Sequence, residues 1–186
     1  MQAVIDACRT GEIRARPCVV ISNNSRSGAI ERARRASIPF AHLSSVMHPD
    51  PDKLDRAICD TLAKHEVDLV LLVGYMKRIG PQTLARYAGR ILNIHPALLP
   101  SFGGQGMYGT RVHEAVLAAG EKVTGVTVHL VDAEYDHGPV VAQRRVPVME
   151  NDTAESLAHR VLEHEHSLLV DTVARIAAGE IVLPEG

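Results

Sequence analysis

The first part of the chain alternates short apolar runs with amphipathic segments. The apolar runs predict buried strands, and segments whose apolar residues recur every three or four positions predict helices. Strands are predicted at 17–21, 40–43, 67–73 and 90–95, and helices at 1–10, 28–36, from 50 onward, 81–89 and 110–119. This alternation is typical of an α/β protein with a Rossmann-like, mostly parallel sheet and helices on both faces.

The pattern changes after Gly120. Two runs, 123–131 and 139–148, alternate or stay apolar with no helix between them, which predicts an antiparallel pair that extends the sheet at its C-terminal side. Asp152 and Glu155 form a capping signal ahead of a last helix over 153–178. No linker, repeat or low-complexity segment interrupts the 186 residues, so one domain over 1–186 is expected.

The composition argues against several classes of binding partner. The formal net charge is −2 and Trp is absent, which argues against a polyanion-binding surface and against a base-stacking platform. Cys8, Cys18 and Cys59 are widely spaced, as in proteins of a reducing compartment. Since the sequence also lacks a bilayer-spanning stretch and a signal-peptide pattern at its start, we expect a cytoplasmic protein without nucleic-acid or membrane partners.

Asn93 and His95 are the leading candidates for chemistry. They lie two apart in an apolar strand that stops at Pro96 and Pro100, so their side chains share a face at the carboxyl end of the strand. Open α/β sheets bind ligands at that end. An amide donor beside an imidazole that titrates near neutral pH therefore indicates a functional site.

Two other motifs are weaker. The run 104–109 matches G-x-G-x-x-G, but the two prolines hold the chain extended between the strand and the glycines, so a loop bordering a pocket is the better interpretation. His164 and His166 point apart on a helix, so no metal site is expected there. His113 and His129 are interpreted as histidines satisfied within amphipathic elements.

Asp136 precedes His137-Gly138-Pro139. One interpretation is a turn aspartate, which is common before Gly-Pro. The other is a carboxylate that orients His95 and raises its pKa. Sequence spacing leaves both open.

Several motifs together resemble the phosphoribosylglycinamide formyltransferases. They are Gly74-Tyr75-Met76 after an apolar strand, Asn93-Ile94-His95-Pro96 with Leu98-Leu99-Pro100, Thr124-Gly125-Val126-Thr127-Val128-His129, Asp136-His137-Gly138-Pro139, and Glu165-His166 on the last helix. The resemblance covers almost the whole chain. It implies a formyltransferase fold and transfer of a formyl group from 10-formyltetrahydrofolate to the amine of glycinamide ribonucleotide, in purine biosynthesis.

The resemblance also implies roles for individual residues. Asn93, His95 and Asp136 match the catalytic trio, the segment Met76, Lys77, Arg78 and Ile79 matches the folate-lining loop together with Asn93, and Glu165 matches a position near the nucleotide. Such a site stabilises the oxyanion that develops when the amine attacks the formyl carbon, and a histidine then protonates the departing nitrogen. The implied cosubstrate is 10-formyltetrahydrofolate, with no metal, small-molecule substrates and a monomer or homodimer.

The chain departs from the family at its start. The family opens with a strand and a Gly/Ser/Asn phosphate loop before the helix that begins here at Met1, and the sequence has neither. The chain is thus expected to be N-terminally truncated relative to the family, with a gap beside the 17–21 strand and weak nucleotide binding.

The alternatives are another folate-dependent formyltransferase or hydrolase, or an inactive folate-binding remnant. A methionyl-tRNA enzyme would carry a basic loop after Leu98-Leu99-Pro100 and a further C-terminal domain, whereas the loop 101–106 is uncharged. A hydrolase would carry an N-terminal regulatory domain.

Overall fold

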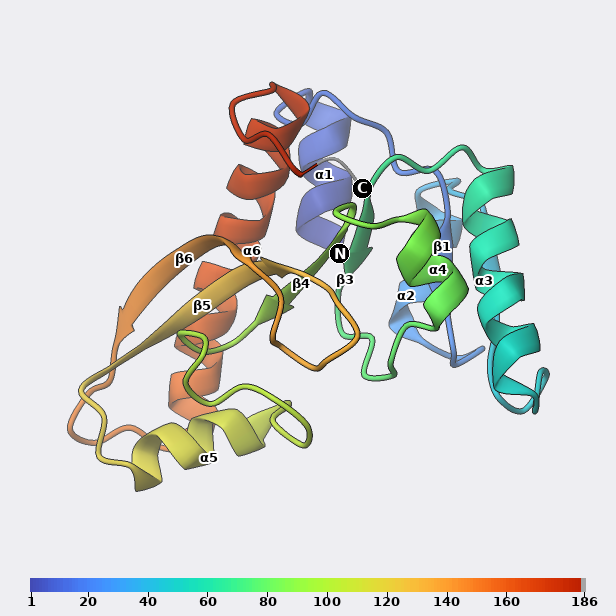
Figure 1. Ribbon diagram of the computed structural model, residues 1–186. Coiled ribbons are helices and arrows are strands. Elements are labelled where there is room, and N and C mark those ends of the chain that lie inside the picture. The colour runs from blue at the N-terminus through green and yellow to red at the C-terminus, as the bar shows by residue number, and fades with distance from the viewer. Residues whose placement is uncertain (185–186) are drawn as a thin grey trace.

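The computed structural model describes residues 1–184 and confirms the predicted order of elements (Figure 1). The helices are α1 (Gln2–Thr10), α2 (Gly28–Arg35), α3 (Pro51–Lys64), α4 (Pro81–Arg86), α5 (Thr110–Ala118) and α6 (Ala154–Ala177). The strands are β1 (Val20–Ser22), β2 (Phe40–His42), β3 (Val70–Leu72), β4 (Ile91–His95), β5 (Val123–Leu130) and β6 (Val140–Pro147).

The strands form two sheets. β1 and β2 pair in parallel, and a second sheet has the order β3-β4-β5-β6. Within it β3 and β4 are parallel, whereas β4/β5 and β5/β6 are antiparallel. The α/β class and the antiparallel C-terminal extension are therefore confirmed, and the strands are divided into two sheets beside β1, where the sequence predicts a gap.

A cavity separates the two sheets. Its volume is about 490 Å³, and its walls include Val20 and Ile21 of β1, Leu71 of β3, and Val4 and Ile5 of α1. β1 and β3 each pair on one side only, so the edges that line the cavity carry unpaired backbone groups. This one-sided pairing also accounts for the shortness of β3, whose ladder covers only 70–72 of the predicted 67–73.

Two apolar clusters hold the helices against the strands. The larger joins β5 and α6 through residues such as Val126, Val128, Leu157 and Val161, and α1 adds Ala7. The second packs Ile58 and Leu62 of α3 near β1 and β3. Figure 1 shows α1 and α6 side by side, with α3 and α4 together away from them.

Helix starts depend on buried or partly buried polar groups. The Asp55 carboxylate on α3 accepts hydrogen bonds from the backbone N–H groups of Gln82 (2.7 Å) and Thr83 (3.1 Å), which anchors the start of α4.

The predicted cap of α6 by Asp152 and Glu155 is wrong. Thr153 is the N-cap and exchanges hydrogen bonds with Ser156, because the helix begins one residue later than that signal requires.

Over residues 1–184, no helix combines the length and the apolar character needed to cross a membrane.

Candidate active site

The site lies at the carboxyl end of β4, where the sequence places it. Asn93 and His95 project from the same face, and their cross-strand neighbours on β5 are His129 and Thr127. The loop after β5 brings Asp136 onto the same face, so the predicted contact between Asp136 and His95 is present. Three side chains separated by up to 43 positions therefore meet at one point.

Asp136 is the centre of this cluster. Its Oδ1 accepts a hydrogen bond from Asn93 Nδ2 (3.3 Å) and lies 3.5 Å from His129 Nε2. Its Oδ2 accepts from the backbone N–H of Gly104 (3.0 Å) and lies 3.4 Å from His95 Nδ1. Burial raises the pKa of Asp136, but the hydrogen bonds and the neighbouring imidazoles together bring it below its ordinary value, so the carboxylate is ionised.

His95 is buried with its two ring nitrogens in different surroundings. Nε2 donates to the carbonyl oxygen of Phe102 (2.8 Å), and Nδ1 faces Asp136. Burial lowers the pKa of His95 more than Asp136 and the Phe102 carbonyl raise it. Asp136 raises this pKa as expected, but the cost of desolvating the cation is larger, so the pKa of His95 lies below its ordinary value. His95 is neutral at pH 7, with Nδ1 able to accept a proton.

Sequence reasoning missed the part played by His129. Its Nδ1 donates to the Leu130 carbonyl (2.8 Å), which leaves Nε2 to accept from Asn93 Nδ2 (3.1 Å). The carboxamide of Asn93 is consequently fixed by both His129 and Asp136. In the sequence, the only sign of this role is that Thr127 and His129 lie two apart in a predicted strand and so share a face. That this face lies next to Asn93 is visible only in the pairing of β5 with β4.

Thr127 holds the loop that follows β4. The fully buried hydroxyl donates to the Ala97 carbonyl (2.6 Å) and accepts from the backbone N–H of Leu99 (3.1 Å) and from Gln143 Nε2 (2.9 Å). The glycine-rich run 104–109 lies beyond this loop. As expected, it borders the site, because its first residue, Gly104, bonds Asp136.

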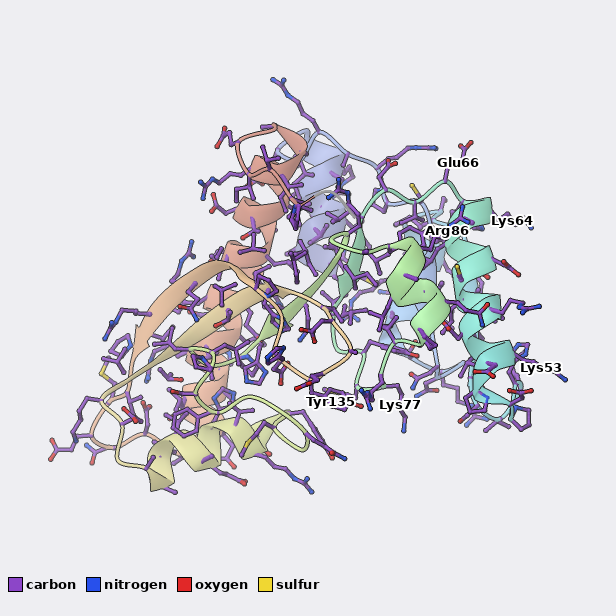
Figure 2. All side chains as sticks on the ribbon, in the orientation of Figure 1. Lys53, Lys64, Glu66, Lys77, Arg86 and Tyr135 are labelled. Atoms are coloured by element: carbon purple, nitrogen blue, oxygen red, sulfur yellow. The ribbon has the colours of Figure 1, made fainter. Side chains whose placement is uncertain are left out.

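The predicted folate-lining segment lies across from Asp136. Lys77, Arg78 and Ile79 line a cavity of about 50 Å³ together with Asn93 and Asp136. Met76 does not line this cavity, and its side chain is half exposed. Figure 2 shows Lys77 and Tyr135 at the same end of the molecule, and both line the cavity.

Glu165 is separate from the trio. It lies on α6 near the amino group of Met1, which favours its ionised form, but burial has the larger effect and raises the pKa of Glu165 to about 7. The structure records no ion pair or hydrogen bond of this carboxyl among the described residues. This region is thus marked by a partly buried carboxyl, beside the start of α1, whose pKa lies near neutrality.

Substitution of Glu165 by Gln is expected to stabilise the protein at alkaline pH. The unfolded carboxyl loses its proton near pH 4.5 and the folded one near 7, so the stability of the wild type falls as pH rises between these values. At pH 8 the variant is expected to be more stable by about 3 kcal/mol, and at pH 4 equal. Urea unfolding at both pH values measures this difference. Glu163→Gln, at an exposed position of α6, is the matched control and should show no such pH dependence; an equal gain in both variants contradicts the assignment.

No three His, Cys, Asp or Glu side chains within residues 1–184 are grouped as a metal ion would require.

Comparison with known proteins identifies the family of the chain. A profile of the formyl transferase family matches residues 1–173. The chain is 43% identical over 182 residues to the chloroplastic phosphoribosylglycinamide formyltransferase of Vigna unguiculata, covering 97% of this chain but only 58% of that relative. It is 44% identical over 177 residues to the phosphoribosylglycinamide formyltransferase of Mycobacterium tuberculosis, covering 95% of this chain and 79% of the relative.

The fold agrees as well. The crystal structure of glycinamide ribonucleotide transformylase 1 from Symbiobacterium toebii superposes with a TM-score of 0.91 and 40% identity, over 100% of this chain and 84% of that one. The match extends over nearly the whole chain, although the chain spans less than two thirds of the plant relative. The chain belongs to the phosphoribosylglycinamide formyltransferase family.

Proposed function

We propose that this protein transfers a formyl group from 10-formyltetrahydrofolate to the amine of glycinamide ribonucleotide. The observation that carries the proposal is the meeting of Asn93, His95 and Asp136 at the carboxyl end of β4, in a chain of this family. The partners are small molecules, the protein is a monomer or homodimer, and a cytoplasmic location stays a prediction from the cysteine pattern.

The residues divide the chemistry between them. Asn93 Nδ2 donates one N–H to His129 and the other to Asp136, so the amide reaches an oxyanion by exchanging one of these two hydrogen bonds for one to the substrate. Neutral His95 accepts the proton of the attacking amine at Nδ1 and returns it to the departing nitrogen. The ionised Asp136 lies 3.4 Å from Nδ1 and stabilises the imidazolium that exists between these two proton transfers.

The cavity beside the trio has walls of the kind that a folate needs, but its volume is too small for one. Leu72, Ile79 and Val131 supply apolar walls, and backbone and carboxylate groups supply polar ones, as expected for a pocket that takes a flat heterocycle. Its volume of about 50 Å³ is far below the roughly 300 Å³ of a small-molecule site. A cavity of this size holds only part of 10-formyltetrahydrofolate, so the rest of the cosubstrate extends beyond it.

Product analysis tests the proposed function. Purified protein is incubated with 10-formyltetrahydrofolate, with and without glycinamide ribonucleotide, and both the formylated nucleotide and free formate are measured. Formylated nucleotide in proportion to tetrahydrofolate is the expected result, and its loss in Asn93→Ala ties the reaction to the site. Formate release that is independent of the nucleotide indicates the hydrolase instead. Equal, near-zero rates in the wild type and in Asn93→Ala indicate a folate-binding remnant.

We also propose that the apolar cavity between β1 and β3 can accept a further strand. The support is that β1 and β3 each present an edge to this cavity, and that no strand of the described residues pairs with either edge. A further strand there would unite the two sheets, and a loop ahead of α1 would direct N–H groups toward a phosphate.

A further inference from the structure

Two loops face each other across the cavity beside the trio. One follows β3 and carries Lys77 and Arg78, and the other follows β5 and carries Asp136. Both contribute to the walls of the same cavity, and Asn93 contributes from β4. Any direct contact between the loops therefore affects where Asp136 lies.

Arg78 makes that contact. Its guanidinium donates a hydrogen bond to the carbonyl oxygen of Ala133 and lies over the ring of Tyr135, 5.8 Å from the ring centroid. Ala133 and Tyr135 are the third residue and the first residue before Asp136. A planar guanidinium can satisfy a carbonyl and cover an aromatic face at once, which a lysine ammonium does less well.

The backbone of Asp136 needs such restraint. Its φ is +55°, a left-handed conformation that few residues other than glycine adopt without cost. On one side the carboxylate is held by the N–H of Gly104. On the other side the Arg78 contacts fix the chain immediately before Asp136.

Lys77 is in a different situation. It lines the same cavity, is exposed, and has no hydrogen bond or ion pair to any residue in the part of the chain that the structure describes. Its ammonium is thus available to the carboxylates of a bound cosubstrate, whereas the guanidinium of Arg78 already has two partners in the protein.

We infer that Arg78 is a positioning residue that sets the place of Asp136 by joining the two loops, and that Lys77 alone of the two cations meets the cosubstrate. The inference rests on the proposed function for its kinetic consequences. It departs from the sequence-based expectation that both residues line the folate.

Steady-state kinetics separate the two roles. Arg78→Ala is expected to lower kcat about tenfold with the KM for 10-formyltetrahydrofolate within about twofold, since only the placement of Asp136 changes. Arg78→Lys retains a donor without the planar stack and is expected to recover part of kcat. Lys77→Ala is expected to raise that KM several-fold at unchanged kcat. A raised KM with normal kcat in Arg78→Ala overturns the inference.

Hydrogen exchange gives a readout that does not require turnover. Backbone amides of 132–137 are expected to exchange faster in Arg78→Ala than in the wild type or in Lys77→Ala, while β4 and β5 stay protected in all three. Unchanged exchange in this segment overturns the inference whether or not the protein is active. Absence of formyl transfer by the wild type, with faster exchange in Arg78→Ala, instead rejects the proposed function and leaves the contact between the loops supported.

Discussion

Replacement of His95 by alanine is expected to lower kcat for formyl transfer about a thousandfold, with little change in the KM of either substrate. The reason is that no other group in the cluster can carry the proton. Asp136 is ionised but holds its oxygens in four contacts, and His129 uses Nδ1 to bond the Leu130 carbonyl and Nε2 to accept from Asn93. Steady-state rates at saturating concentrations of both substrates measure the loss.

The matched control is His159→Ala, which removes an exposed histidine of α6 and should leave kcat unchanged. The pH profile of the wild type adds a second check. Because burial lowers the pKa of His95, the neutral form needed to accept a proton persists below the usual histidine range, and the acid limb of kcat/KM should lie below pH 6.5. An acid limb at or above that value, or a His95→Ala variant with more than a tenth of wild-type kcat, contradicts the assigned role.

The sequence predicted that Asn93 and His95 lie together because chain direction alone determines the position of both residues. Asn93 and His95 are two apart in one strand, so their shared face follows from strand geometry. The carboxyl end of that strand is where α/β sheets bind ligands, so the place of the site followed as well. The contact of Asp136 with these two residues was left open, because a turn residue 41 positions beyond His95 can face in any direction.

The features that sequence reasoning missed depend on pairing between distant segments. His129 joins the cluster only because β5 pairs with β4 in one particular register, which sets it opposite Asn93. The lowered pKa of His95 depends on how completely its ring is buried, and no local pattern gives that quantity. The contact of Arg78 with Tyr135 joins two loops whose conformations the sequence does not determine.

Helix positions were predicted closely for a different reason. The 3.6-residue period and the capping residues act within a few positions, so the predicted 28–36 helix is observed as α2 over Gly28–Arg35. The cap of α6 was wrong because several polar residues stand next to one another at its start, and tertiary contacts select among them. Asp152 instead forms a two-pronged ion pair with Arg160.

Extension of the N-terminus by an apolar strand and a short Gly/Ser/Asn loop is expected to raise the melting temperature by about 10 °C. The cavity of about 490 Å³ lies between two strand edges with unpaired backbone groups, and Met1 lines it, so an added segment can reach it directly. A strand of about six β-branched residues would pair with both edges and bury its side chains, each methylene contributing about 0.8 kcal/mol. The entropy lost on ordering the strand, about 1–2 kcal/mol per residue, offsets much of that gain and leaves a few kcal/mol.

The control extension has the same length but carries proline at alternate strand positions, which removes the N–H groups needed for pairing. Its melting temperature should match that of the unextended chain. Calorimetry of the three proteins separates strand insertion from a general effect of added residues, since only the proline-free extension can unite the two sheets. The same extension should tighten binding of glycinamide ribonucleotide, because the loop brings N–H groups to the start of α1, where the helix dipole favours a phosphate. Identical melting temperatures for the two extended proteins would mean that the cavity does not accept a strand, and the division of the sheet would then be a property of this fold.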